Sequence, residues 1–482
     1  MTVIETISNL VSPIYDVLWA IAFVVLIGSG LYFTFRLKGV QLIRFGRSMR
    51  LTFERERHKD GRTVSAFQAF CIGMGTRIGV GNIAGVATAI ITGGPGAIFW
   101  MWVFALVGAA TSFMESTLSQ IYKERKEDGG FFGGPAYYAS KGTGNRRLGI
   151  AVAVVLTLTL GFGFIAVEAS VSASALSSAF PFEGNTWVFA IVIALLATVL
   201  ITGGVRRIAR FSTVIVPLMA VSWIVFAGVL ICLNIGNVPA AFGMIFEQAF
   251  APSSIVGGGI GTAISIGLQR GIFSNDSGLG TVSNVAAVAD IRHPIKQGFI
   301  QSFGVLVDTL LICTVTALVI LSYGSFESIY WGFGDMVDGS WNPHDGSVLV
   351  QDVAAATIGS AANVIIALFM LVFSFTSLVG DYVSSESNLR FIRDDRRIVT
   401  FLRIGIIAIA AVSAVLDTEF IDLICFTFIA VMAILNVAII MRLRNDVFEA
   451  YDDYNGQLRE GVEEPEFRSD SITNSSGVTE WR

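Results

Sequence analysis

The sequence predicts an all-α integral membrane protein with eleven transmembrane helices, in which one N-terminal helix precedes two five-helix repeats of opposite orientation. Three observations predict this class. The 482 residues are 54% hydrophobic and 14% charged, with a mean hydropathy of +0.70, whereas soluble domains carry about 25% charged residues. Lys and Arg are concentrated in every second loop. Two apolar segments are interrupted by glycine and polar residues in a similar pattern, 199 residues apart.

Windows of about 20 predominantly apolar residues are long enough to cross a bilayer as helices. We expect the span that begins at Leu148 to tilt or to extend beyond the bilayer. The eleven predicted spans are Pro13–Phe35, Val64–Ile91, Gly96–Ile121, Leu148–Phe180, Thr186–Ile201, Phe211–Leu233, Ile255–Ala289, Gln297–Leu321, Ala361–Ser384, Ile398–Leu416 and Phe420–Met441.

The loops provide an independent test, because Lys and Arg gather on the cytoplasmic side of membrane proteins. Loop Arg36–Arg62 holds nine of these residues and loop Lys123–Arg147 holds six, and the other basic loops follow in strict alternation. The intervening loops hold none: 181–185, 234–254, 322–360 and 417–419. This alternation predicts a multi-pass protein of the plasma (cell) membrane with its N-terminus outside and its C-terminus in the cytoplasm.

Several function classes are disfavoured. The net charge of −5 argues against nucleic acid as a partner. His58, His293 and His344 lie in separate loops, and no HExxH, Walker A or nucleophile-elbow motif is present, so we expect no enzyme activity. The four cysteines lie in apolar segments and are interpreted as packing residues. Segment 445–482 is polar and is interpreted as a disordered tail, and loop 322–360 as a solvated linker or an extracellular lid.

The segment Gly75–Ile90 predicts an interruption inside the second span. Four glycines within eleven residues and one arginine, Arg77, are unfavourable for a continuous helix at membrane depth. Small-residue packing between helices is an alternative explanation for Gly81 and Gly85. It does not explain Arg77, because a charge at that depth costs roughly 2.5–3.5 kcal/mol. A broken membrane helix exposes helix ends of opposite partial charge, which is how transporters build polar binding sites.

A weak internal repeat supports a second interruption. Residues 79–88 and 278–287 share four of ten identities, and each copy opens a block of five spans of opposite predicted orientation. We therefore divide the chain into an N-terminal helix with its basic loop (1–63), two repeats (64–235 and 236–444) and the polar tail (445–482). The repeat places the second break at Asn275–Thr281, with the glycines of 257–261 as the alternative.

Six further motifs resemble the alanine-or-glycine:cation symporter family: Gly75–Ile90, Gly93–Trp102, Glu115–Leu118, Gly133–Tyr138, Arg270–Gly280 and His293–Gly298. Together they cover much of the chain from residue 65 onward. The resemblance implies a LeuT-like fold and an alternating-access symporter that imports a small alanine- or glycine-like amino acid with sodium, with no other cofactor. The alternatives are coupling to protons, a more polar amino-acid substrate, or an amino-acid sensor that does not transport. The oligomeric state stays open.

A zwitterionic substrate needs donors for its carboxylate and acceptors for its ammonium. We expect the free amides near Gly79–Asn82 to bind the carboxylate and the carbonyls near Gly73–Thr76 to bind a cation. Asn82 could instead cap the outer half-helix. Arg77 is expected to pair with carbonyls or with an internal carboxylate, either Glu115 or Asp308. The predicted substrate site from the two breaks comprises Thr76, Gly79, Val80, Gly81, Asn82, Gly278, Gly280 and Thr281.

On the ninth span, Ser374, Ser377, Asp381 and Ser384 share one helical face, which we expect to point into the bundle. For Ser374 and Ser384, hydrogen bonding between helices explains the hydroxyls. The segment Thr376–Gly380 resembles the family pattern at a sodium site, which implies sodium binding by Thr376 and Ser377, together with Gly75.

Two positions depart from the family pattern. Asp381 stands where the family has Trp, and Glu168 and Ser170 stand where it has Gln-x-Asn. We assign Glu168 and Asp381 to the substrate site, and two interpretations remain. Either these carboxylates serve a larger or more polar substrate or proton coupling, or each is held by Arg77 or another internal donor.

Overall fold

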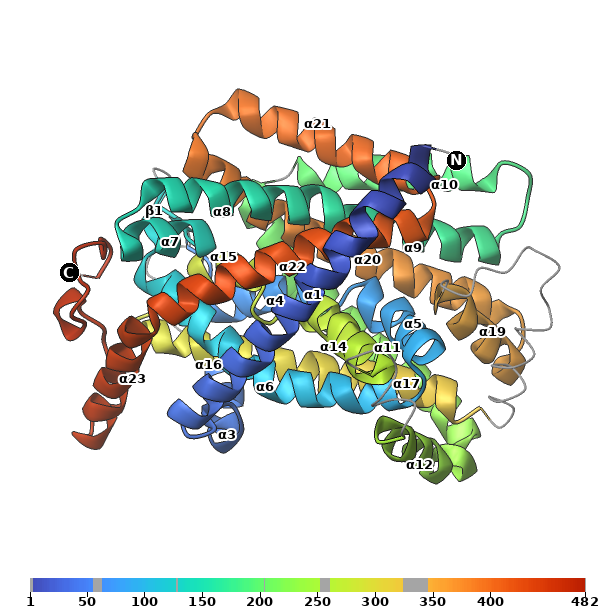
Figure 1. Cartoon of the computed structure of the whole chain (residues 1–482), viewed down its shortest axis with the longest axis horizontal. Helices are drawn as coiled ribbons and strands as arrows, with labels where there is room; N and C mark the ends of the chain where they lie inside the picture. The colour runs from blue at the N-terminus through green and yellow to red at the C-terminus, as the bar shows by residue number, and fades with distance from the viewer. Residues whose placement is uncertain are drawn as a thin grey trace.

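Long apolar helices run side by side through the molecule (Figure 1). The computed structural model describes residues 3–54, 63–126, 129–202, 204–251, 261–323 and 346–481. Within these ranges, seven helices are long and apolar enough to cross a membrane: Ile4–Arg36, Gly96–Ile121, Arg146–Ala179, Arg207–Leu233, Pro294–Leu321, Ala361–Ile392 and Thr418–Arg442. The total of eleven spans stays a prediction.

The first quarter of the chain contains the N-terminal helix and the first interrupted span. Helix α1 packs across α22 and α6, and only 22% of its apolar window is buried, so most of α1 faces outward. It begins ten residues before the predicted span and contains Pro13. The elements are α1 (Val3–Arg36), α2 (Val40–Ile43), α3 (Phe45–Thr52), α4 (Ala66–Arg77), the 3-10 turn η1 (Val80–Asn82), α5 (Ala84–Gly93) and α6 (Gly96–Ile121).

The middle of the chain opens with a two-stranded antiparallel hairpin and continues with long helices. A π-helical segment joins α8 and α9 into one span of 34 residues, longer than the predicted span from Leu148. The elements are β1 (Glu124–Arg125), β2 (Phe131–Phe132), α7 (Pro135–Thr143), α8 (Arg146–Leu158), η2 (Thr159–Phe164), α9 (Ile165–Ala179), α10 (Asn185–Ile201), α11 (Gly204–Leu233) and α12 (Val238–Ala249).

The second half contains the other interrupted span and a second π-helical segment, which joins α16 and α17. The elements are α14 (Thr262–Asn275), α15 (Thr281–Ala287), α16 (Pro294–Leu306), η4 (Val307–Cys313), α17 (Thr314–Leu321), α19 (Gly346–Ile358), α20 (Ala361–Ile392), α21 (Arg396–Ser413), α22 (Thr418–Arg442) and α23 (Arg444–Arg459). Helices α3, α7 and α23 lie at the left of Figure 1, and α12 and α19 lie at the right. We call the left end, where α1, α6 and α20 also terminate, the basic end.

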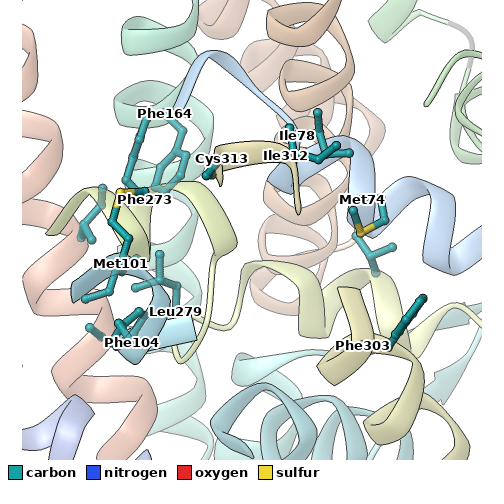
Figure 2. Packing of buried hydrophobic residues seen from close by; sticks show 14 of the residues in the cluster. Met74, Ile78, Met101, Phe104, Phe164, Phe273, Leu279, Phe303, Ile312 and Cys313 are labelled. Carbon is teal, nitrogen blue, oxygen red and sulfur yellow. The ribbon is translucent and has the colours of Figure 1, made fainter. Parts of the chain in front are cut away.

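Both predicted interruptions are present. The first span stops at Arg77 and resumes at Ala84, and the second stops at Asn275 and resumes at Thr281. The preferred position of the second break, Asn275–Thr281, is therefore confirmed. In the alternative position, residues 257–260 lie outside the described residues. Figure 2 shows that buried apolar side chains surround both breaks, with Phe164 and Phe273 against each other and ring centroids 5.2 Å apart.

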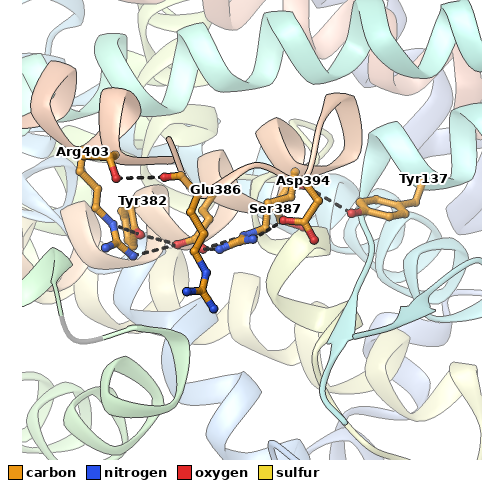
Figure 3. Close-up of polar contacts among 9 residues, drawn as sticks. Tyr137, Tyr382, Glu386, Ser387, Asp394 and Arg403 are labelled. Carbon is orange, nitrogen blue, oxygen red and sulfur yellow. Dashed lines mark hydrogen bonds and ion pairs between the residues drawn. The ribbon is translucent and has the colours of Figure 1, made fainter. Parts of the chain in front are cut away.

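Helix α20 is anchored at the basic end by a polar network (Figure 3). Tyr382 donates to the Glu386 carboxylate, and Arg403 of α21 donates from Nε to the Tyr382 hydroxyl at 2.7 Å. One turn on, the Tyr137 hydroxyl of α7 donates to the Ser387 carbonyl at 3.4 Å. These bonds tie α20 to α21 and α7, and so set the position of the polar face described below.

The prediction of a disordered tail was wrong. Residues 444–459 form α23, and the segment after it folds back over the basic end of the bundle. The Trp481 indole donates to the Gln120 carbonyl at 2.9 Å, and the Phe467 amide donates to the Arg292 carbonyl at 3.0 Å. Four apolar side chains, spaced too irregularly to form a helical period, are buried there: Phe467, Ile472, Val478 and Trp481.

The interpretation of loop 322–360 as a solvated linker was wrong for its second part. Residues 346–358 form α19, which buries Leu349, Val350 and Val353 and packs against α5 and α20. The approach is close, because a Cβ on Gly346 would lie 2.1 Å from the Ala84 carbonyl oxygen. Residues 324–345 of this loop, and with them the aromatic residues near Tyr330, lie outside the described residues.

Candidate functional site

The first break releases two backbone carbonyls from the helical ladder. In a continuous helix, the amides of Gly79 and Val80 would donate to the carbonyls of Gly75 and Thr76. Here the Gly79 amide donates to the Arg77 carbonyl (2.9 Å) and the Asn82 side chain (3.0 Å), and the Val80 amide donates to Glu168 (3.2 Å). The carbonyl oxygens of Gly75 and Thr76 are therefore available to other partners.

Glu168, on α9, occupies the position that we predicted for a substrate carboxylate. Its Oε2 accepts the Val80 amide, and a Cβ on Gly79 would lie 2.3 Å from its Oε1. Of the four amides near Gly79–Asn82, those of Gly79, Val80 and Asn82 have partners within the protein, and only that of Gly81 has none among the described residues. In this conformation, substrate-carboxylate binding at Val80 requires that Glu168 move.

Asn82 caps the 3-10 turn η1 rather than α5, and its expected contact with substrate stays a prediction. Its Oδ1 accepts the Gly79 amide and closes the turn, and its Nδ2 donates to Asp308 (2.6 Å) and Ser274 (3.2 Å). Asp308 lies in the π-helical segment η4 and also accepts from the Ser274 hydroxyl at 2.8 Å. Asn82 thus connects the first break to α14, just before the second break.

A second buried glutamate, Glu115 of α6, stabilises the second break. Its carboxylate accepts the amides of Gly278 (3.4 Å) and Gly280 (3.0 Å) and the Asn436 side chain (2.9 Å). Both glycines have φ of +81°, a backbone conformation that favours glycine. The amides of Gly278 and Gly280, which we predicted to contact the substrate, therefore bind Glu115 instead. Each break thus has one glutamate from a neighbouring helix.

Arg77 is bonded only to neutral acceptors. Its guanidinium donates to the Asn275 carbonyl (2.9 Å), to Gln301 (3.0 Å) and to Ser112 (3.1 Å), and it is 1% exposed. The prediction of a carbonyl partner is confirmed. Neither Glu115 nor Asp308 accepts a hydrogen bond from Arg77 within the described part of the chain. Arg77 therefore links the end of α4 to the end of α14.

The polar face of α20 packs directly on the end of α4. The Ser377 hydroxyl donates to the Thr76 carbonyl at 3.2 Å, and a Cβ on Gly380 would lie 2.1 Å from the Thr76 side chain. Gly75 also lies against α20, since a Cβ on Gly75 would lie 3.4 Å from the Thr376 carbonyl oxygen. The predicted sodium residues Gly75, Thr376 and Ser377 are thus neighbours.

The interhelical role expected of the outer serines on this face is confirmed. Ser374 donates to the Glu168 carbonyl at 3.0 Å, and Ser384 donates to the Thr281 carbonyl at 3.2 Å. These two bonds connect α20 to α9 and to α15, so the face between them lies among both breaks and Glu168.

Three buried polar side chains next to this face lack ordinary partners. No hydrogen bond reaches either carboxyl oxygen of Asp276, Oδ1 of Asp381 or the Thr281 hydroxyl in the described residues, and Asp381 has one long contact, with Ser377 at 3.5 Å. Asp381 is within electrostatic range of both Asp276 and Glu168. Buried oxygens without partners are rare in folded proteins, and an ion, a ligand or an ordered water molecule can satisfy them. Asp276 was missed in the sequence, although the cost argument applied to Arg77 applies equally to it.

The site is closed toward the end that carries α12 and α19. Arg270 pairs with Asp422 at 2.9 Å, and Phe273 lies between Phe164 and Phe426 with centroid distances of 5.2 Å. A cavity of about 20 Å³ remains beside Val80. That volume holds about one water molecule, so a ligand as large as an amino acid would fit only after this layer opens.

We expect Gly280→Ala to lower the free energy of unfolding by about 2 kcal/mol, because a positive φ strains alanine by about 1–3 kcal/mol. Its Cβ would also lie 2.3 Å from Cγ of Pro135. The matched control is Gly228→Ala in α11, where nothing lies within 4 Å and helix propensity favours alanine by roughly 0.5–1 kcal/mol. Thermal unfolding in detergent checks both. Equal midpoints for the two variants would contradict the strained turn.

Two discontinuous helices that meet inside a helical membrane bundle are typical of secondary transporters. The fold matches the solved structure of MhsT in complex with L-phenylalanine, with a TM-score of 0.57 and 14% identity over 89% of this chain and 94% of that one. The family model for the sodium:alanine symporter family matches residues 4–469. The chain therefore belongs to the sodium:alanine symporter family.

Two relatives from Bacillus subtilis (strain 168) match over nearly their full length. The probable sodium/glutamine symporter GlnT is 39% identical over 478 residues, covering 99% of this chain and 96% of the relative. The amino-acid carrier protein AlsT is 40% identical over 475 residues, covering 98% and 97%. The family resemblance seen in the sequence is confirmed, and so is the expectation of a multi-pass membrane transporter that is not an enzyme.

Proposed function

We propose that this protein is a secondary active symporter that imports a small amino acid together with sodium by alternating access. The observation that carries the proposal is the contact between the first break and α20. There the carbonyls of Gly75 and Thr76 have lost their helical donors, and the Ser377 hydroxyl lies 3.2 Å from one of them. Unwound carbonyls and hydroxyl oxygens are the ligands that Na⁺ takes in transporters of this kind. Thr376, on the same turn, supplies a further oxygen.

Binding of a zwitterion requires acceptors for its ammonium group as well as donors for its carboxylate. In the described part of the chain, the Gly81 amide is the donor at the first break that has no partner. Among the described residues, the available acceptors without a partner include carboxyl oxygens of Asp276 and Asp381 and the Thr281 hydroxyl. We assign the ammonium group to these acceptors, because charge-assisted hydrogen bonds are the strongest available to it.

A substrate with a polar side chain is the second candidate. Asp381 stands where the family has an aromatic residue, and its Oδ1 is without a partner among the described residues. This oxygen can accept from a side-chain amide, and the relative GlnT is named as a probable glutamine symporter. The amino-acid class is thus supported by the family, and glutamine is an explicit alternative to alanine.

We infer an orientation with the basic end in the cytoplasm, supported by the strict alternation of Lys and Arg along the loops. The two repeats, 64–235 and 236–444, then each contribute one discontinuous helix to the centre of an alternating-access transporter. The two breaks resemble each other, because a buried glutamate from a neighbouring helix stabilises each of them. This resemblance supports the division of the chain into two repeats.

Purified protein in proteoliposomes tests the function. We expect labelled alanine or glutamine to accumulate only under an inward sodium gradient, with potassium on both sides as the control. Accumulation under a proton gradient without sodium would replace sodium coupling by proton coupling. Saturable binding without accumulation would instead identify a sensor.

A further inference from the structure

A large cavity at the basic end lies outside the substrate site. It has a volume of about 550 Å³ and lies between the end of α1, the short helices α2 and α3, and α23. Five cationic side chains and one carboxylate, Asp452, line it. The cations are Arg36, Lys38, Arg44, Arg47 and Arg459.

Three of these cations have no ion-pair partner in the part of the chain that the structure describes. Across the described residues, no carboxylate lies within ion-pair distance of Arg36, Arg44 or Arg47. Aromatic rings hold two of the guanidinium groups instead: Arg36 lies 4.8 Å from the ring centroid of Phe448, and Arg47 lies 5.0 Å from that of Tyr454. Arg47 also donates to the Tyr454 hydroxyl at 3.0 Å, and its buried Nε–H has no partner in the described structure. The cavity is therefore a preorganised acceptor of negative charge.

The surroundings of the cavity are apolar and face outward. Phe35 at the end of α1 is 77% exposed, and Ile43 of α2 is 75% exposed. Helix α3 and the residue that follows it continue the same surface, with Phe45, Met49 and Phe53 exposed. Short amphipathic helices of this kind lie in the membrane interface. The cavity thus opens where lipid headgroups meet acyl chains.

We propose that this cavity binds the phosphodiester headgroup of an anionic phospholipid from the leaflet at the basic end. The headgroup phosphate pairs with Arg44 and Arg47, and the acyl chains run along the exposed surface of α1. A soluble anion would account for the cations but not for the adjoining apolar surface. The bound lipid also joins α1 to α23, the helix whose extension covers the basic end of the bundle.

Native mass spectrometry of the full-length protein in neutral detergent tests the proposal. The added probes are phosphatidylglycerol, cardiolipin, phosphatidylcholine and inorganic phosphate. We expect the two anionic lipids to bind in preference to phosphatidylcholine, and R44Q/R47Q to lower their affinity about 30-fold, since each cation near an anionic headgroup contributes about fivefold. The matched control is R396Q/R397Q, which removes two exposed arginines from the same end of the molecule, at α21.

Equal losses in both double variants would mean diffuse attraction and would overturn the site. Competition by inorganic phosphate at the same concentration as lipid would overturn the lipid assignment. Because R44Q/R47Q could fold poorly, a photoreactive phosphatidylglycerol is used on the unaltered protein. We expect it to label peptides from 35–49 and 448–459, and labelling confined to other helices would also overturn the proposal.

Discussion

We expect Asp381→Asn to lower the ratio of the maximal rate of uptake to KM about 100-fold. The ligand-free variant should at the same time be more stable to heat than the unaltered protein. The carboxylate is buried, with one unpartnered oxygen and one long contact to Ser377 among the described residues. A buried charge without a counter-ion destabilises the empty protein. When a cationic ligand binds, the same charge forms a hydrogen bond that contributes about 1.5–3 kcal/mol, or roughly 10- to 150-fold.

Uptake by proteoliposomes and thermal unfolding in detergent measure the two effects on the same preparations. The control is Asp394→Asn, an exposed carboxylate just beyond α20, for which we expect full uptake. Uptake of alanine and uptake of glutamine are measured separately, to compare the effect of the substitution on substrates with different side chains. A selective loss for glutamine would assign Asp381 to the substrate side chain, and an equal loss for both would assign it to the ammonium group or sodium. Wild-type uptake by the variant would remove Asp381 from the site.

Glu168→Gln should lower the KM for the amino acid about 30-fold. In the closed structure the Glu168 carboxylate occupies the Val80 amide and lies beside Gly79. A substrate carboxylate entering there meets a like charge whenever Glu168 is ionised. Two unit charges at 4 Å interact by about 4 kcal/mol at an effective dielectric constant of 20, and half of that is about 30-fold. Glutamine keeps an oxygen for the Val80 amide while removing the charge.

Concentration dependence of sodium-driven uptake measures this effect, with Glu183→Gln in an exposed loop as the control. Glu168→Ala separates charge from structure, because it leaves the Val80 amide without an acceptor and should lower thermal stability instead. If Glu168 carried a coupling proton, the glutamine variant would lose proton-dependent uptake at an unchanged KM. An unchanged KM with unchanged ion dependence would leave Glu168 as a structural residue.

Both variants act on the closed state of the site, and contacts at two ends of the molecule maintain that state. The Arg270–Asp422 pair and the stacked ring of Phe273 close one side of the first break. At the basic end, the side chain of Gln120 donates to the carbonyls of Ala286 and Ala289, and Trp481 packs on the same turn. Since the cavity beside Val80 holds about one water molecule, both the substrate and the movement of Glu168 depend on opening one of these layers.

The sequence alone determined the membrane class and the position of the first break, and it gave a preferred and an alternative position for the second. Hydropathy and the alternation of basic loops are strong local signals. A helix must be long and apolar to cross the bilayer, and Lys and Arg are enriched in the cytoplasmic loops. The first break was visible because glycines and Arg77 are unfavourable inside an unbroken membrane helix. The second followed from its similarity to the first. Gly75, Thr376 and Ser377, assigned through a family resemblance, do lie together.

Only the tertiary structure decided which partner each buried polar group takes. Arg77 bonds Asn275, Gln301 and Ser112 rather than either expected carboxylate, and Glu115 and Glu168 bind the amides that we had reserved for a substrate. These hydrogen-bond partners depend on how helices that are distant in the sequence cross each other. A shift of one helix by a single turn would bring other acceptors next to each donor. The ordered tail was missed for a related reason, since its buried residues follow no period. They are buried because the end of the bundle provides an irregular surface that only the assembled fold creates.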